Sequence, residues 1–217
     1  MRILFLGCGG GRLNVLKQFY STAGFVIDCS KKIYVDPGPG AAIQFRKFEK
    51  KFKLKITDIE GIYVSHAHLD HINDVEVVIE GMTDYATKKK GFLICDKSIL
   101  GKTLIEQLSD TLNILNVLNI LKFEQNKKDK EKTEKNPSDS EIEEIGEITP
   151  SISNYHKNLI EKIYTISPGK IVEIDNLTFK GTKTKHDSPA TGFVLEDKFE
   201  NIKLGYTSDT EFFEGIL

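Results

Sequence analysis

Four potential metal ligands lie within six consecutive positions of this 217-residue chain, at His66, His68, Asp70 and His71. They follow the apolar run 62–64, which is typical of a strand. In an extended segment, side chains two residues apart project to the same side, so one ion can bind both His66 and His68. Asp70 and His71 come where a helix can begin and point elsewhere. One short loop is therefore predicted to supply ligands to two adjacent divalent ions.

Two later residues lie in similar positions, where a predicted strand meets a loop. His186 follows a strand predicted at residues 177–184, and Asp209 follows one predicted at residues 202–206. Without a bound metal ion, burying such a set of imidazoles and carboxylates would cost several kcal/mol in desolvation, or the side chains would have to lie in water. The remaining histidine, His156, lies in a variable region and is not expected to be a ligand.

Short strands are predicted in two sets, with helices between and around them. Runs of apolar and β-branched residues bounded by turn residues predict strands at 2–6, 24–28, 32–35, 62–64, 91–95, 163–166, 170–174, 177–184, 191–196 and 202–206. Helical spacing at 41–53 predicts an amphipathic helix with Ile43, Phe45, Phe48 and Phe52 directed inward. Residues 98–121 predict one or two further helices. This order of elements indicates sheets packed together with helices outside them.

The chain is expected to form one domain, residues 1–217, with a charged variable insertion at about 112–157. Residues 122–149 are dominated by Lys, Glu, Asp and Asn, so we expect them to be solvated unless a partner orders them. The acidic stretch 141–147 argues against nucleic-acid binding by this insertion taken alone.

The composition of the chain says more about the cellular compartment of the protein than about its substrate. A net charge of −2 does not favour any class of substrate, so a phosphate group would have to be held by local charge or by metal. Cys8, Cys29 and Cys95 are odd in number and widely spaced, which fits a reducing compartment. No run approaches the ~20 apolar residues of a membrane span, and no secretion signal follows Met1. We expect a cytoplasmic protein without membrane contact.

Taken in order, these motifs resemble the metallo-β-lactamase fold superfamily of metallohydrolases. The resemblance rests on residues 5–10, 35–38 and 66–71, on His186 with Gly192-Phe193, and on Ser208-Asp209-Thr210. It implies an α/β fold, a four-layered αββα sandwich, of which the C-terminal part is expected to be shortened.

The resemblance also implies a ligand set. His66, His68 and His186 would hold one ion, and Asp70 and His71 would hold the second, with Asp209 bridging both. Asp36 would orient ligands from behind, and Asp70 would orient the attacking water or accept its proton. Histidines combined with carboxylates suit zinc, with manganese or iron as alternatives.

One feature departs from the family pattern. Members that bind two metals usually carry another histidine beyond the bridging aspartate, whereas this sequence ends at Leu217 without one. We therefore expect a shortened form, or a second ion completed by water or by another subunit of a homo-oligomer.

For function, the resemblance favours hydrolysis of phosphodiester bonds in a small-molecule or nucleic-acid substrate. Two adjacent ions can deprotonate a bridging water near neutral pH. Asp209 stands where zinc β-lactamases typically carry cysteine, and the His186 loop is similar to the phosphodiesterase branch, which includes tRNase Z and cyclic-nucleotide phosphodiesterases. The alternatives are hydrolysis of a thioester or lactone, oxidation by a mononuclear iron dioxygenase, and a non-catalytic binding protein.

Overall fold

The computed structural model describes residues 1–17, 19–101 and 151–216. These residues belong to one compact unit, formed by Met1–Gly101 and Thr149–Leu217. Most of the predicted insertion and of the helices predicted at 98–121 lie outside the described residues.

The first sheet has six strands in the order β1-β2-β3-β4-β5-β6. Their bounds are Arg2–Phe5, Phe25–Asp28, Lys32–Val35, Gly61–Val64, Phe92–Cys95 and Lys162–Thr165. The strands β1, β2 and β3 pair antiparallel, whereas β3 to β6 run parallel. Both β4 and β5 are buried at every position, which is typical of parallel strands covered on both faces.

The second sheet has four antiparallel strands in the order β10-β9-β8-β7. Their bounds are Ile202–Tyr206, Thr191–Asp197, Leu177–Lys183 and Ile171–Ile174. One face of this sheet packs on the first sheet through buried side chains such as Tyr63, Phe179 and Phe193. The rings of Tyr63 and Phe193 meet edge to face, with centroids 4.6 Å apart.

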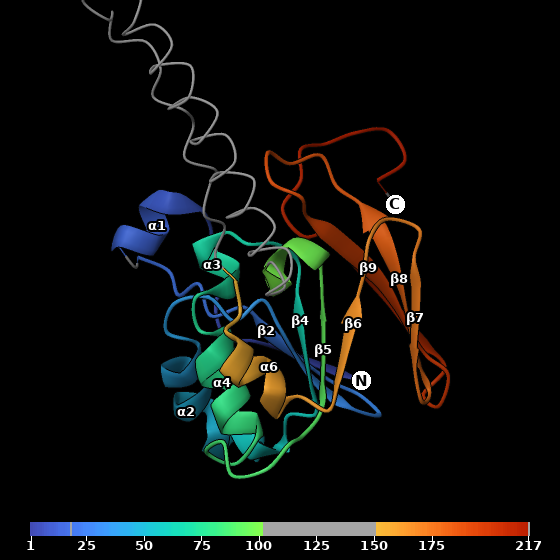
Figure 1. Ribbon diagram of the computed structural model, residues 1–217. Helices are drawn as coiled ribbons and strands as arrows, with labels where there is room; N and C mark the ends of the chain where they lie inside the picture. Colours follow the sequence, from blue (N-terminus) through green and yellow to red (C-terminus); the bar gives the residue numbers. More distant parts are fainter. Residues whose placement is uncertain (18, 102–150, 217) are drawn as a thin grey trace, which may run out of the picture. The chain divides into compact units, whose positions relative to one another are not determined.

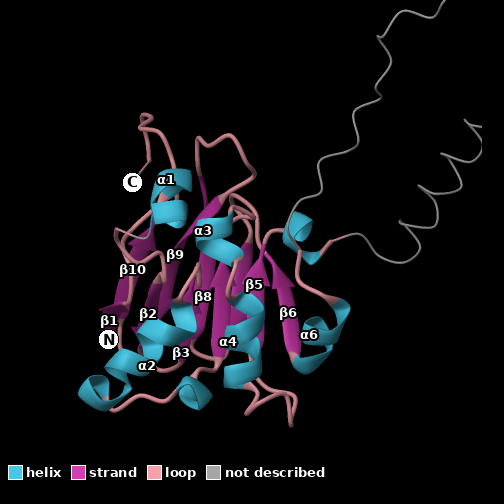
Figure 2. Ribbon diagram, turned by 90° about the vertical axis from the view of Figure 1, so that its left-hand side faces the viewer, coloured by secondary structure: helices cyan, strands magenta, loops and turns pink. Residues whose placement is uncertain are grey.

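Helices cover the other face of the six-stranded sheet, as Figures 1 and 2 show. They are α2 (Ala41–Phe52), α4 (Val75–Met82) and α6 (Asn154–Leu159), with the short α1 (Gly11–Lys17) and α3 (Leu69–Ile72) near the loops of one sheet edge. Two 3-10 turns, η1 (Ile56–Asp58) and η2 (Lys97–Leu100), complete the described elements. The predicted packing of two sheets with helices outside is confirmed for the six-stranded sheet; among the described residues, no helix packs on the outer face of the four-stranded sheet.

The bounds of the strands agree with the sequence prediction to within one or two residues. The predicted direction of one side chain in α2 does not agree. Phe45 is buried, and Phe48 and Phe52 pack against the core, whereas Ile43 is 64% exposed. Residues 41, 45, 48 and 52 share one face of a helix, and Ile43 lies about 200° around the axis from both Ala41 and Phe45. The prediction that Ile43 points inward was therefore wrong.

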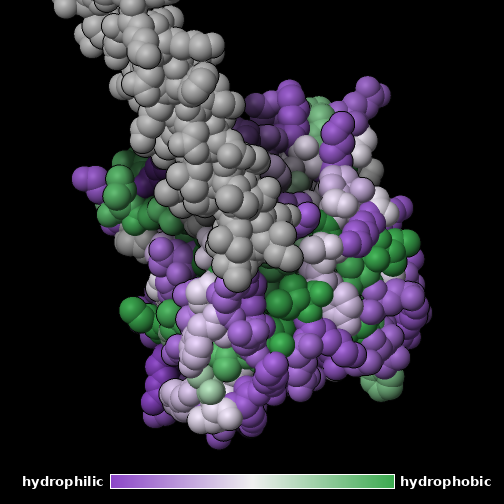
Figure 3. Space-filling model, viewed as in Figure 1, coloured by the Kyte–Doolittle hydropathy of each residue, from purple (hydrophilic) through white to green (hydrophobic). Residues whose placement is uncertain are grey.

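The surface seen in Figure 3 is mostly hydrophilic, with separate hydrophobic patches. Within the described part of the chain, no helix has the length and apolar character needed to cross a bilayer.

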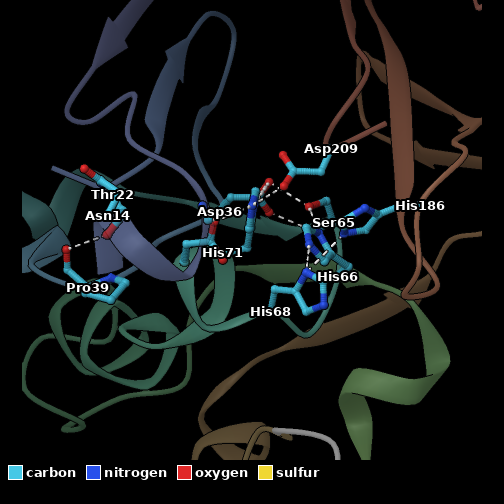
Figure 4. Close-up of polar contacts among 12 residues, drawn as sticks. Asn14, Thr22, Asp36, Pro39, Ser65, His66, His68, His71, His186 and Asp209 are labelled. Carbon is cyan, nitrogen blue, oxygen red and sulfur yellow. Dashed lines mark hydrogen bonds and ion pairs between the residues drawn. The ribbon is translucent and has the colours of Figure 1, made fainter. Parts of the chain in front are cut away.

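The topology brings the chemically important loops to one edge. The parallel strands β3 and β4 end at the same side, which places Asp36 beside the 65–68 segment. In the second sheet β8 and β10 both pair antiparallel with β9, so the loops that follow them, with His186 and Asp209, leave at a common edge. Figure 4 shows these side chains close together.

Candidate metal centre

Three histidines converge at this edge and form what we call the first ligand group: His66, His68 and His186. His68 Nδ1 lies 3.0 Å from His66 Nε2 and 3.0 Å from His186 Nε2 (Figure 4). His66 is fully buried and the other two are partly exposed. His66 and His68 thus point to the same side, as the sequence predicted. The third ligand, His186, comes from a loop 118 residues after His68.

The spacing of these nitrogens suits a tetrahedral ion. Ligand nitrogens at about 2.0–2.1 Å from a tetrahedral zinc lie about 3.3 Å from one another. The two contacts of 3.0 Å are close to this value. Without a cation, the converging lone pairs can be satisfied only by sharing protons among the three rings.

A second ligand group consists of His66, His71 and Asp209. His71 Nε2 lies 3.4 Å from the carboxylate of Asp209 and 3.5 Å from that of Asp70. Asp70 also accepts a hydrogen bond of 2.7 Å from the backbone N–H of Gly11. Asp70 thus lies beside the second ligand group, and His66 belongs to both groups.

Asp36 lies behind these ligands and is buried. Its carboxylate accepts hydrogen bonds from the backbone N–H of Ser65 and from the Ser65 hydroxyl, both at 2.7 Å. It also lies 3.0 Å from Nδ1 of His71. The residue has a φ of 49°, a conformation that is uncommon outside glycine and that the surrounding hydrogen bonds maintain.

The electrostatics of the site favour added positive charge. Burial raises the pKa of Asp36, but the charge and hydrogen bond of His71 outweigh it and lower the pKa overall. The pKa values of Asp70 and Asp209 are also lowered, with His71 as a main cause in both. Burial lowers the pKa of His71, but the three carboxylates outweigh it and raise this pKa to about 12. For His66, burial followed by the charge of His71 lowers the pKa to about 4.

Three residues that contact the site were not predicted from the sequence: Ser65, Asp187 and Tyr206. The hydroxyls of Ser65 and Tyr206 both donate to Asp36. Asp187 Oδ1 lies 3.2 Å from His186 Nε2, although its side chain is largely exposed. Its only sequence signal is that it follows His186 directly. His156, which was not expected to be a ligand, lies between Glu76 and Glu80 of α4, apart from both ligand groups.

A cleft of about 230 Å³ opens beside the second ligand group. Its walls include the glycine-rich segment 7–10 together with Asp70, His71 and Asp209. A Cβ on Gly7 would meet the carbonyl oxygen of Ser21 at 2.3 Å, so glycine allows the close approach of the backbone here.

Comparison with known proteins places the chain in a family. The family model described as "Anti-Pycsar protein Apyc1" matches residues 1–143. The chain belongs to this family. Along its whole length, this Apyc1-family chain is also similar to the uncharacterized protein MJ1374 of Methanocaldococcus jannaschii, with 30% identity over 219 residues. The chain spans 64% of that protein's length.

Solved structures show the fold of this Apyc1-family chain. YhfI from Bacillus subtilis, a metallo-β-lactamase fold protein, aligns with a TM-score of 0.55 at 15% identity, covering 98% of this chain and 63% of its own. The short form of human tRNase Z aligns with a TM-score of 0.53 at 15% identity, covering 94% of this chain and 67% of its own. The predicted metallo-β-lactamase fold is thereby confirmed.

Proposed function

We propose that this protein is a metal-dependent hydrolase that cleaves phosphodiester bonds in nucleotides. The observation that carries the proposal is the pair of ligand groups that share His66, one made of imidazoles and the other containing a carboxylate. In this proposal His66, His68 and His186 would hold one divalent ion, and His71 and Asp70 would hold the second, with Asp209 as a ligand available to both.

The donor set suits this role. Imidazole and carboxylate ligands are those that zinc and manganese accept, and the buried carboxylates favour added positive charge. Ions held there would supply Lewis-acid activation of an attacking water and of the scissile phosphodiester group. The second ligand group supports this arrangement over a mononuclear iron site, which would need only the first.

In this proposal, Asp70 orients the attacking water or accepts its proton. Its carboxylate is ionised because hydrogen bonds from His71 and from the backbone N–H of Gly11 outweigh burial and lower its pKa. The same two contacts fix its direction. A carboxylate held in this way at the wall of the cleft can orient an attacking water without moving.

Cyclic nucleotides are the first substrate class to test. The family carries the name of an anti-Pycsar protein, which points to degradation of cyclic nucleotides. The name of the fold neighbour tRNase Z makes RNA the second class, although its identity to this chain is only 15%.

The test is a substrate panel applied to the natural chain and to His68→Ala. His68 is the N-cap of α3 but makes no side-chain capping hydrogen bond, so its removal should leave the fold intact. We expect the variant to lose metal at the first ligand group and to lose turnover of bis(p-nitrophenyl) phosphate and of cyclic nucleotides. The matched control, His156→Ala, removes an imidazole outside both groups and should keep both properties. Unchanged turnover by His68→Ala would refute the proposal.

A further inference from the structure

One carboxylate oxygen, Oδ2 of Asp36, has three side-chain partners. The Ser65 hydroxyl donates to it at 2.7 Å, and His71 Nδ1 lies at 3.0 Å. The third is the Tyr206 hydroxyl, which donates at 2.6 Å. Ser65 and His71 follow β4 of the first sheet, whereas Tyr206 is the last residue of β10 in the second sheet.

These contacts make Nδ1 of each histidine a hydrogen-bond donor. An ionised carboxylate can only accept, so Nδ1 of His71 must donate to Asp36. The Ser65 hydroxyl has one proton and gives it to Asp36, so Ser65 must accept from Nδ1 of His66, which lies 2.9 Å away. Both histidines then use Nδ1 as a donor and direct Nε2 to the ligand groups, where Nε2 is the nitrogen that can bind an ion.

Asp36 therefore acts on both ligand groups at once. It orients His71 directly, and it orients His66 through Ser65. Outer-shell partners of this kind fix the ring orientation and the proton position of a ligating histidine. The carboxylate itself needs a fixed position, and the hydroxyl of Tyr206 is its contact from the opposite sheet.

We propose that Tyr206 is a positioning residue of the metal centre, which holds Asp36 so that His66 and His71 present Nε2 to divalent ions. This role rests on the function proposed above. The ring of Tyr206 is itself fixed between the sheets, with centroids 5.1 Å from Phe25 and 5.4 Å from Phe193. The phenol therefore joins the packing of the two sheets to the geometry of the ligands.

The chain offers a matched control in Tyr63. Its hydroxyl donates at 2.7 Å to the backbone carbonyl of Thr191, and its ring packs against Phe193 in the same core. Tyr206→Phe and Tyr63→Phe each remove one hydroxyl that bonds across the sheets, and the hydroxyl of Tyr63 also lies 3.3 Å from the carbonyl of Gly192. Tyr63 is fully buried, so Tyr63→Phe should lower the free energy of unfolding at least as much as Tyr206→Phe.

The experiment is a titration of the full chain and both variants, stripped of metal, with Zn²⁺ and Mn²⁺ by calorimetry and with Co²⁺ by visible absorption. We expect Tyr206→Phe to lose about 10- to 100-fold in affinity for the ion at the second ligand group and to change the Co²⁺ spectrum. Tyr63→Phe should keep the affinity and spectrum of the natural chain. Melting curves in chelator measure the stability of each metal-free variant separately.

Natural affinity and spectrum in Tyr206→Phe would overturn the positioning role, as would an equal loss in Tyr63→Phe. If the natural chain binds metal as described but cleaves no phosphodiester, the proposed function fails while the role of Tyr206 stands. If the natural chain binds no metal, both are refuted.

Discussion

Gly38 lies so close to Asp70 that a Cβ atom added to Gly38 would meet the carbonyl oxygen of Asp70 at 1.9 Å. The turn that follows β3 therefore supports the backbone of α3, where Asp70 and His71 are located. Asp74 adds to this support, since its backbone N–H donates at 2.9 Å to the carbonyl of Pro37.

Gly38→Ala should consequently displace α3. We expect a loss of about 1–3 kcal/mol in the free energy of unfolding, measured in urea, because the added methyl overfills a closed contact. Metal affinity should fall with it, since Asp70 and His71 move. Gly205→Ala is the control, as an added Cβ there meets no heavy atom within 4 Å. Equal stability and metal affinity in the two variants would contradict the proposed contact.

Asp70→Asn separates the charge of Asp70 from its shape. The amide oxygen of asparagine can still accept the hydrogen bond from Gly11, but the side chain no longer accepts a proton. We expect the turnover number to fall by about 10²- to 10⁴-fold. Metal bound at the first ligand group, measured by elemental analysis, should remain.

Asp84→Asn is the matched control for that substitution. Asp84 forms an exposed ion pair with Lys88 and has a φ of 57°, which asparagine tolerates well. Its turnover should equal that of the natural chain. A comparable turnover in Asp70→Asn would remove Asp70 from the chemistry.

The cysteines should differ sharply in reactivity at pH 8. Burial raises the pKa of Cys29 to about 11 and that of Cys95 to about 12, so both stay protonated at this pH, and the thiolate is the reactive form. Cys8 is exposed and lines the cleft. We expect iodoacetamide to label one thiol rapidly in the folded protein and none in Cys8→Ser, as read by mass spectrometry. Rapid labelling of two or three thiols would show that Cys29 or Cys95 is more accessible than this structure has it.

Much of the fold was predictable because its signals are local. Apolar runs between turn residues located the strands, and the two-residue spacing of His66 and His68 predicted a shared direction. The family resemblance, which the comparisons confirm, then joined His186 and Asp209 to that cluster. The cytoplasmic location, the homo-oligomer and the extent of the charged insertion remain predictions.

The roles of Ser65 and Tyr206 could not be predicted, because they depend on how two sheets pack. Tyr206 reads in sequence as an ordinary strand residue, and only the approach of β10 to the end of β3 brings its hydroxyl to Asp36. The prediction for Ile43 was wrong for a simpler reason. An apolar side chain at the wrong angle on a helix stays exposed whatever its hydropathy.

Metal content measured together with phosphodiester turnover tests the central claim most directly. The chain should bind two divalent ions, lose turnover of bis(p-nitrophenyl) phosphate on treatment with chelator, and regain it when Zn²⁺ or Mn²⁺ is restored. Bound ions should also raise the melting temperature. At a free metal concentration of 100 times the dissociation constant, each occupied site adds about 2.7 kcal/mol to the free energy of unfolding. Undiminished turnover by protein shown to be free of metal would contradict the account.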